Sequence, residues 1–125
     1  MTIRDAKGSR AAKAKGRQFE NDVKDVYLRH GFKHVERRRL TGHHDMGDIT
    51  GIPNLTVECK NHSKMALSDW IDQTIDEANA AGTENFVLHH KRRGHDAMNS
   101  YVSMPMWMWI RYAQLLKSVF EKDPS

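Results

Sequence analysis

Cysteine is nearly missing from this chain, which has only Cys59 among its 125 residues. A single cysteine excludes an internal disulfide and a zinc site built from several cysteines. Long apolar runs are missing as well, so neither a membrane span nor a signal peptide is expected. The chain shows no internal repeat, and its length suits one modest hydrophobic core. We therefore expect a soluble, cytoplasmic protein with a single domain.

The charge of the chain is basic and unevenly distributed. Lysine and arginine number 20 against 16 acidic residues, and the net charge of +4 favours an anionic partner. Three basic clusters stand out: the region up to Arg17, which includes Lys15; Arg37, Arg38 and Arg39; and Lys91, Arg92 and Arg93. Each cluster alone is compatible with an ordinary solvated surface. Together, around one candidate site, they favour contacts with the phosphates of a nucleic acid.

The spacing of apolar residues predicts a folded domain after a basic arm. Residues 1–15 are rich in alanine, glycine, serine and basic residues, which predicts a flexible arm ahead of a single domain over residues 16–122. Three helices are predicted, over residues 16–30, 68–82 and 105–120, and five strands, over residues 32–38, 48–52, 55–61, 85–90 and 100–104. Ser68 is expected to cap the second helix, Gly82 to end it, and Pro105 to lie in the first turn of the third. This order predicts an α/β (α+β) fold with a central mixed β-sheet flanked by helices.

The predicted strand over residues 55–61 carries a Glu-X-Lys motif. Because side chains alternate along a strand, Val57 and Cys59 share one face, and Glu58 and Lys60 share the other. The apolar set is expected to enter the core. Glu58 and Lys60 are then expected to stand side by side on the opposite surface.

A second acid, Asp48, opens the preceding predicted strand ten residues before Glu58. If the two strands are neighbours, both carboxylates and the Lys60 amine converge. Two carboxylates this close repel each other unless a cation lies between them, so Asp48 and Glu58 are expected to bind Mg²⁺, with the backbone carbonyl of Cys59 as a third ligand. Lys60 can orient the attacking water or offset transition-state charge. The pattern predicts metal-dependent hydrolysis of a phosphodiester.

Two further polar residues are candidates for this site. Glu20, at the border of the apolar stripe of the first predicted helix, can accept a metal-bound water or hold a second ion. Gln73, in the second predicted helix, can fix Lys60 or a phosphate oxygen. The ordinary alternatives are a helix-surface acid for Glu20 and a solvated amide for Gln73.

The order of four motifs resembles the PD-(D/E)XK nuclease superfamily, and within it the archaeal-type and phage Holliday junction resolvases. The motifs are Lys15-Gly16-Arg17-Gln18-Phe19-Glu20, His30-Gly31-Phe32, Gly47-Asp48-Ile49 and Val57-Glu58-Cys59-Lys60. The resemblance covers residues 15–75, and beyond them only the order of elements agrees. One departure is Gly47, which stands where the superfamily's name expects proline. The role of His43 and His44 is left open, because the insertion that contains them is less familiar.

The resemblance implies a restriction-endonuclease-like αβββαβ core and a structure-selective endonuclease. It assigns catalysis to Glu20, Asp48, Glu58 and Lys60, metal binding to Asp48 and Glu58, and Mg²⁺ or Mn²⁺ as the cofactor. The implied substrate is branched DNA, a four-way junction, cut in the cytoplasm of a bacterial, archaeal or phage-infected cell. The implied enzyme is a homodimer, since two opposed cuts require two sites related by a twofold axis.

An unusually apolar segment near the end of the chain leaves two interpretations. The residues concerned are Met104, Met106, Trp107, Met108, Trp109 and Ile110. They can belong to the core, or they can form the dimer interface, since a chain this small has little room to bury two tryptophans and three methionines.

Three other functions stay open. His44, Asn54 and His62 stand at intervals similar to those of an HNH nuclease, but Asn54 and His62 are not predicted on the helix that this motif requires. A non-catalytic DNA-binding module would explain the basic charge alone. Other nucleases of the same superfamily, cutting single strands, flaps or forks, are also possible: a related exonuclease group has a glutamine near Gln73, although its usual tyrosine is replaced by Glu77.

Overall fold

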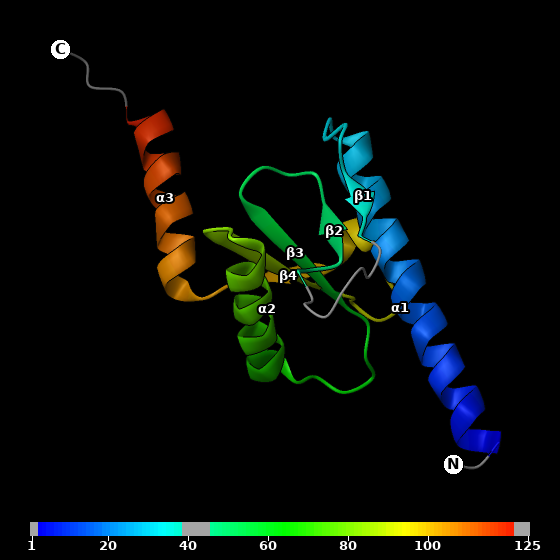
Figure 1. The fold of residues 1–125 in the computed structure, drawn as a ribbon. Helices are drawn as coiled ribbons and strands as arrows, with labels where there is room; N and C mark the ends of the chain where they lie inside the picture. The colour runs from blue at the N-terminus through cyan, green and yellow to red at the C-terminus, as the bar shows by residue number, and fades with distance from the viewer. Residues whose placement is uncertain (1–2, 39–45, 122–125) are drawn as a thin grey trace.

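The computed structural model describes residues 3–38 and 46–121, with side chains from residue 10 onward. Within these ranges the helices are α1 (Ile3–Arg29), α2 (Leu67–Ala81), the 3-10 helix η1 (Ala97–Asn99) and α3 (Met106–Phe120). The strands are β1 (Glu36–Arg37), β2 (Ile49–Thr50), β3 (Leu55–Lys60), β4 (Asn85–His90) and β5 (Tyr101–Ser103). Figure 1 shows the strands between α1 on one side and α2 and α3 on the other.

The described strands form one mixed sheet in the order β1-β2-β3-β4-β5. The central pair, β3 and β4, is parallel and in register from Leu55 opposite Asn85 to Lys60 opposite His90. The other pairs are antiparallel. Helix α2 connects the parallel pair, because parallel strands cannot be joined by a tight turn. The prediction of a mixed sheet flanked by helices is confirmed, while the finer restriction-endonuclease-like core stays a prediction.

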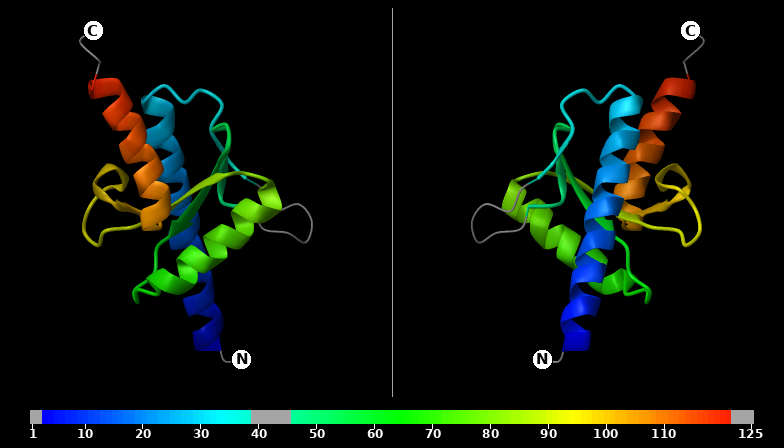
Figure 2. Two further views of the ribbon diagram at one scale, coloured as in Figure 1. Left: turned by 90° about the vertical axis from the view of Figure 1, so that its left-hand side faces the viewer. Right: turned by 90° about the vertical axis from the view of Figure 1, so that its right-hand side faces the viewer.

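Helices cover both faces of the central strands. On one face, Phe19 and Val23 of α1 pack against Val57, Cys59 and Val87. The opposite face contacts α2 and the first turn of α3, where Ala78 and Met108 surround Phe86. The two side views in Figure 2 show α1 and α3 on opposite sides of the sheet.

The burial of Glu58 differs from the prediction of a surface position. Glu58 and Lys60 do share the face opposite the apolar residues, but α2 covers this face and Glu58 is only 2% exposed. The crossover helix α2 covers one face of β3 and α1 covers the other, so this strand is buried on both faces. The acid of the Glu-X-Lys motif is therefore a buried group.

Helix α1 begins at Ile3, so the predicted start of the first helix at residue 16 is wrong, and most of the segment expected to be a flexible arm is helical. Alanine, lysine and arginine, which dominate this segment, have high helix propensity, and each of its glycines, Gly8 and Gly16, costs only about 1 kcal/mol in a helix. The first turns of α1 extend beyond the sheet (Figure 1).

The ends of other elements also differ from the predictions. Helix α2 is preceded by Ala66, with no side-chain cap, so Ser68 lies inside the first turn instead of capping it. Gly82 does end α2 in the left-handed conformation, and its N–H donates to the carbonyls of the last turn. The first strand is shortened to Glu36–Arg37, since the residues before it form turns after α1. Pro105 precedes α3 as its N-cap residue.

The apolar segment near the end of the chain is only partly core. Met108 is buried and Met104 is half-buried. The exposed members are Met106, Trp107, Trp109 and Ile110. The core interpretation is therefore wrong for most of this segment.

Some predictions fall outside the described ranges. Arg39, His43 and His44 lie there. In the part of the chain that is described, no helix combines the length and the apolar character needed to cross a bilayer.

Candidate active site

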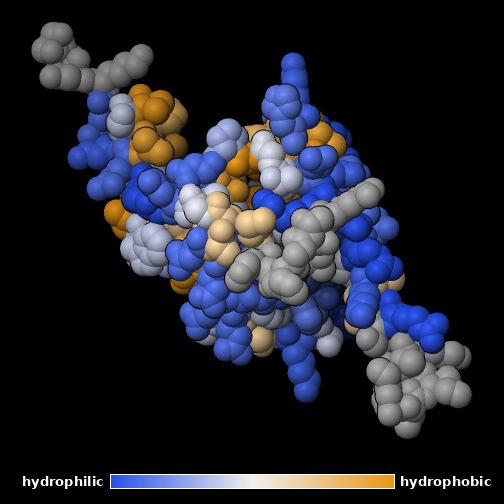
Figure 3. Space-filling model, viewed as in Figure 1, coloured by the Kyte–Doolittle hydropathy of each residue, from blue (hydrophilic) through white to orange (hydrophobic). Residues whose placement is uncertain are grey.

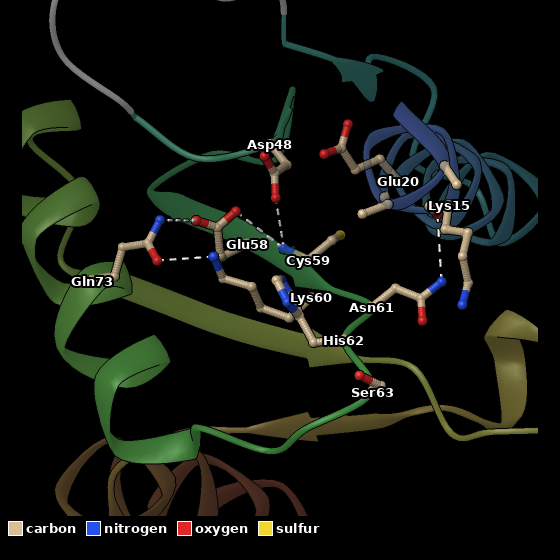
Figure 4. A pocket seen from close by; sticks show the side chains of 13 residues that line it. Lys15, Glu20, Asp48, Glu58, Cys59, Lys60, Asn61, His62, Ser63 and Gln73 are labelled. Atoms are coloured by element: carbon tan, nitrogen blue, oxygen red, sulfur yellow. Dashed lines mark hydrogen bonds between the residues drawn. The ribbon is translucent and has the colours of Figure 1, made fainter. Parts of the chain in front are cut away.

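One cavity of about 470 Å³ lies between α1, α2 and the end of β3. It is lined by all five residues whose side chains are predicted to act in the site: Glu20, Asp48, Glu58, Lys60 and Gln73. Figure 4 shows them approaching from three directions, with Glu20 on α1, Gln73 on α2, and the other three at the β2 and β3 strands between them. The structure thus brings together the groups that the sequence predicts to meet.

Asp48 is fixed by two hydrogen bonds to β3. Its backbone N–H donates to the carbonyl of Val57 at 2.8 Å, which continues the pairing of the hairpin. Its carboxylate Oδ2 accepts from the N–H of Cys59, also at 2.8 Å. The Asp48 carboxylate thus accepts the Cys59 hydrogen bond that a backbone carbonyl would otherwise accept in a longer strand pair. This bond holds the carboxylate beside Glu58.

Gly47 explains the departure from proline at this motif. Its φ is +97°, a conformation that proline, fixed near −65°, cannot adopt. An added Cβ would also lie 2.9 Å from Cγ2 of Thr56 and 3.0 Å from the Val57 carbonyl oxygen. Glycine therefore permits the close approach that places Asp48 against β3.

Glu58 is the buried carboxyl of the site. Its Oε2 accepts from Nε2 of Gln73 at 3.3 Å, and its Oε1 accepts from the N–H of Cys59 at 3.2 Å. Burial, followed by hydrogen bonds and charge repulsion from Asp48 and Glu77, raises the pKa of Glu58 to about 12. Without a cation this carboxyl keeps its proton at neutral pH, because burial and the neighbouring acids disfavour its ionised form.

Gln73 joins the acid and the amine of the Glu-X-Lys motif. Its Oε1 accepts from Nζ of Lys60 at 2.9 Å. Its Nε2 donates to Oε1 of Glu77 at 2.8 Å as well as to Glu58. The amide therefore orients the Lys60 ammonium toward the cavity and connects it to both buried acids.

Glu20 approaches from the opposite wall. Burial and the neighbouring Asp48 carboxylate raise its pKa to about 7, against the opposing effect of Arg37. The Nε of Arg37 lies 3.6 Å from Oε2 of Glu20, so part of the Arg37 charge is directed at this acid instead of at the solvent. At neutral pH the Glu20 carboxyl can both release and accept a proton, which suits a general base.

The donors present fit a hard cation that keeps most of its water. Across the described ranges, no three His, Cys, Asp or Glu side chains are grouped to hold a metal by themselves. Mg²⁺ is commonly bound through one or two carboxylates, with waters and substrate phosphates completing its shell. Asp48 and Glu58 supply two carboxylates. Backbone direction alternates along a strand, so the carbonyl of Cys59 points to the same side as that of Val57, toward Asp48.

Part of the predicted DNA-binding set meets beside this cavity. A second hollow of about 290 Å³ is lined by Lys15, Lys91 and Arg93. It shares Lys15, Asn61, His62 and Ser63 with the acidic cavity. Three cations from α1 and from the segment after β4 are thus brought next to the carboxylates.

Other predicted DNA contacts are placed differently. The Arg92 guanidinium lies 5.5 Å from the centre of the Tyr101 ring, away from the basic hollow. Arg38 is half-buried, and its backbone N–H donates to the Asp48 carbonyl. Arg17 lies close enough to Glu20 to lower its pKa slightly.

The geometry does not form an HNH site from Asn54 and His62. Asn54 lies in the turn before β3, where its Oδ1 accepts from the N–H of Glu84 at 2.7 Å. His62 follows the other end of β3, with its ring against Trp70. The six residues of β3 separate them by about 20 Å, too far to share a metal.

Glu77 is a site residue that the sequence prediction missed. It is buried on α2 and accepts from Gln73 one helical turn away. A signal was available, because Glu77 lies seven residues after Trp70 and beside Ala78, on the apolar stripe of α2. An acid on a buried stripe is unusual and points to a polar contact.

No protein-family model, curated protein or solved structure matches this chain. The chemistry of the cavity is therefore inferred from its own residues. Two adjacent carboxylates, a carboxyl with a pKa near neutrality and an oriented ammonium are a suitable set for hydrolysing a phosphate ester in the presence of a divalent cation.

Proposed function

We propose that this protein is a Mg²⁺- or Mn²⁺-dependent DNA endonuclease that resolves four-way junctions by paired hydrolysis of phosphodiesters. The observation that carries the proposal is the convergence of Asp48, Glu58, Lys60 and Gln73 in one cavity. Both acids accept a hydrogen bond from the backbone N–H of Cys59 in β3. The order of motifs along the chain supports the same reaction.

Each residue has a distinct role in the proposed reaction. Asp48, Glu58 and the Cys59 carbonyl would hold the cation. When bound, the cation would offset negative charge on the phosphate and make water more acidic. Lys60, held by Gln73, places its ammonium where negative charge increases in the transition state. Glu20 accepts the proton of the attacking water, since its pKa of about 7 lets it act near neutral pH.

The proposed partner is a branched DNA bound through its phosphates. Lys15, Lys91 and Arg93 surround the hollow that joins the acidic cavity, so a strand leaving the scissile phosphate meets positive charge. Such contacts position DNA without reading its bases. Further phosphate contacts are proposed for Arg17, Arg37, Arg38 and Arg39, whereas Arg92, which lies over the Tyr101 ring outside the hollow, is not expected to contact a phosphate. Two opposed cuts require two active sites, so we propose a homodimer in the cytoplasm.

A second candidate is an exonuclease of the same superfamily. The contact of Gln73 with both Lys60 and Glu58 favours it, because that group has a glutamine near this position. The buried Glu77 stands where the group has a tyrosine. The junction resolvase therefore accounts for the site with fewer departures.

The test offers purified protein, with Mg²⁺, a mobile four-way junction, a replication fork, a flap and linear duplex in parallel. Paired symmetrical nicks in the junction are expected. Asp48→Asn should lose cleavage and retain binding to the junction. Progressive shortening of linear DNA would favour the exonuclease, and binding without any cleavage would show a DNA-binding module. His44→Ala is expected to retain cleavage, whereas an HNH enzyme would lose it.

A further inference from the structure

We infer that the solvent-facing apolar side of α3 is a docking surface for α3 of a second copy of this chain. The inference rests on the proposed function for its biological purpose, because paired cuts need two copies of the chain. It deepens that function by naming the surface that joins the two copies. Its structural support is separate, because it comes from α3 and the neighbouring groove and not from the acidic cavity.

One apolar row of α3 begins in the core and continues past it. Met108 is fully buried and Tyr112, one turn later, donates to Oδ1 of Asn85 at 3.2 Å. Leu115 and Val119 continue the same row at intervals of three and four residues, but both are exposed. The chain's own sheet supports only the first half of α3, and the second half projects beyond it (Figure 1).

A second apolar row of α3 faces solvent along its whole length. Trp109 is 46% exposed, Leu116 51% and Phe120 81%, with Ala113 between them. Their intervals of four, three and four residues are those of the a and d positions through which two helices pack in a coiled coil. Because the row contains no charged side chain, a twofold contact along it places no like charges at its centre.

The start of this row adjoins an apolar groove. A hollow of about 780 Å³ between α2, β5 and α3 is lined by Leu67, Ile71, Met106 and Trp109. Figure 3 shows hydrophobic residues gathered along α3 and toward the sheet. The groove widens the surface beyond a single helix, which matters because two heptads alone make a short coiled coil.

The exposed apolar area matches what a dimer requires. Six large exposed residues lie on the side of α3 that carries the two rows: Met106, Trp109, Leu115, Leu116, Val119 and Phe120. Weighted by their exposed fractions, they present on the order of 700 Å², close to the roughly 800 Å² that each partner contributes to a standard interface. The largest apolar patch of a typical monomer is only about 300–600 Å².

The charges of α3 favour a second copy over a lipid surface. Helices that bind membranes present a polar face rich in free lysine and arginine. Here Arg111 donates to the Glu84 carbonyl and lies over the Trp107 ring, and Lys117 pairs with Glu121 at 3.7 Å. These two cations of α3 are engaged within the chain, so little charge is left to attract anionic lipid.

Sedimentation equilibrium across a range of concentrations tests the inference. The wild-type chain of 14.5 kDa is expected at twice that mass in the micromolar range. Leu116→Glu should shift the association to at least 100-fold higher concentration. Gln114→Glu, which adds the same charge to an exposed position outside both rows, should leave it unchanged. Circular dichroism confirms that both variants are folded.

Two results would overturn the inference: a wild-type chain that stays monomeric throughout, or an equal effect of both substitutions. Binding of a monomeric wild type to phosphatidylglycerol vesicles would identify a lipid surface instead. Nicking assays separate this inference from the proposed function. A Leu116→Glu monomer that still nicks one strand but loses paired cutting supports both. A wild-type dimer without any metal-dependent cleavage supports the surface and refutes the nuclease.

Discussion

Replacing Glu58 by glutamine should stabilise the metal-free protein. The pKa of this acid is raised from 4.5 to about 12 in the folded chain, chiefly by burial. The folded state therefore retains a proton that the unfolded state releases above pH 4.5. Each pH unit above 4.5 then lowers the free energy of unfolding by about 1.4 kcal/mol. Glutamine has no proton to lose and preserves the size of the side chain.

The expected magnitude follows from the interval between pH 4.5 and pH 7. Over two and a half units the wild type loses about 3 kcal/mol of unfolding free energy that Glu58→Gln retains. The two proteins should therefore converge below pH 4.5 and separate progressively above it. Mg²⁺ should reverse the order, because it stabilises only a chain with the carboxylate to bind it.

Urea denaturation in EDTA, repeated from pH 4 to pH 8, measures this difference. Glu84→Gln serves as a matched control at an exposed position and should stay within about 0.5 kcal/mol of the wild type. A Glu58→Gln variant that is no more stable than the wild type at pH 7, with a difference independent of pH, would refute the reasoning. It would show that Glu58 is ionised and compensated in the metal-free fold.

Two further predictions concern the basic hollow and the hairpin. Lys91→Gln and Arg93→Gln should each reduce by about one the slope of log affinity for the junction against log salt concentration, with cleavage at saturation unchanged. Arg92→Gln, outside the hollow, should leave this slope unchanged. Equal slopes for the three variants would refute the proposed path of the strand. Gly51→Ala should cost at least about 2 kcal/mol of stability in urea denaturation, since φ is +105° and the new Cβ would lie 2.0 Å from the His34 carbonyl oxygen. Gly94→Ala, also at positive φ but with open space around it, should cost less; equal losses would contradict the steric argument.

Much of the site could be predicted because its spacing depends on local rules. Strand alternation placed Glu58 and Lys60 on one face, and the short hairpin turn placed Asp48 opposite β3. Both rules depend on residues near one another in the chain. Glu20 and Gln73 are candidates from the sequence, but a surface position is equally open for each until the helices are placed against the sheet.

The remaining features depend on how distant elements meet. The burial of Glu58 follows from the passage of α2 over β3, and the role of Glu77 follows from the same contact. The early start of α1 reflects a propensity that outweighs two glycines. The apolar pattern of α3 does not show how many of its turns pack against the sheet of the same chain.

The central claim is that a divalent cation is bound between Asp48 and Glu58. Crystals grown with MnCl₂ and measured near the manganese absorption edge test it most directly. The account predicts an anomalous peak in coordination contact with one carboxylate oxygen of each residue and with the Cys59 carbonyl. Ordered carboxylates that face apart, with no peak between them, would contradict it.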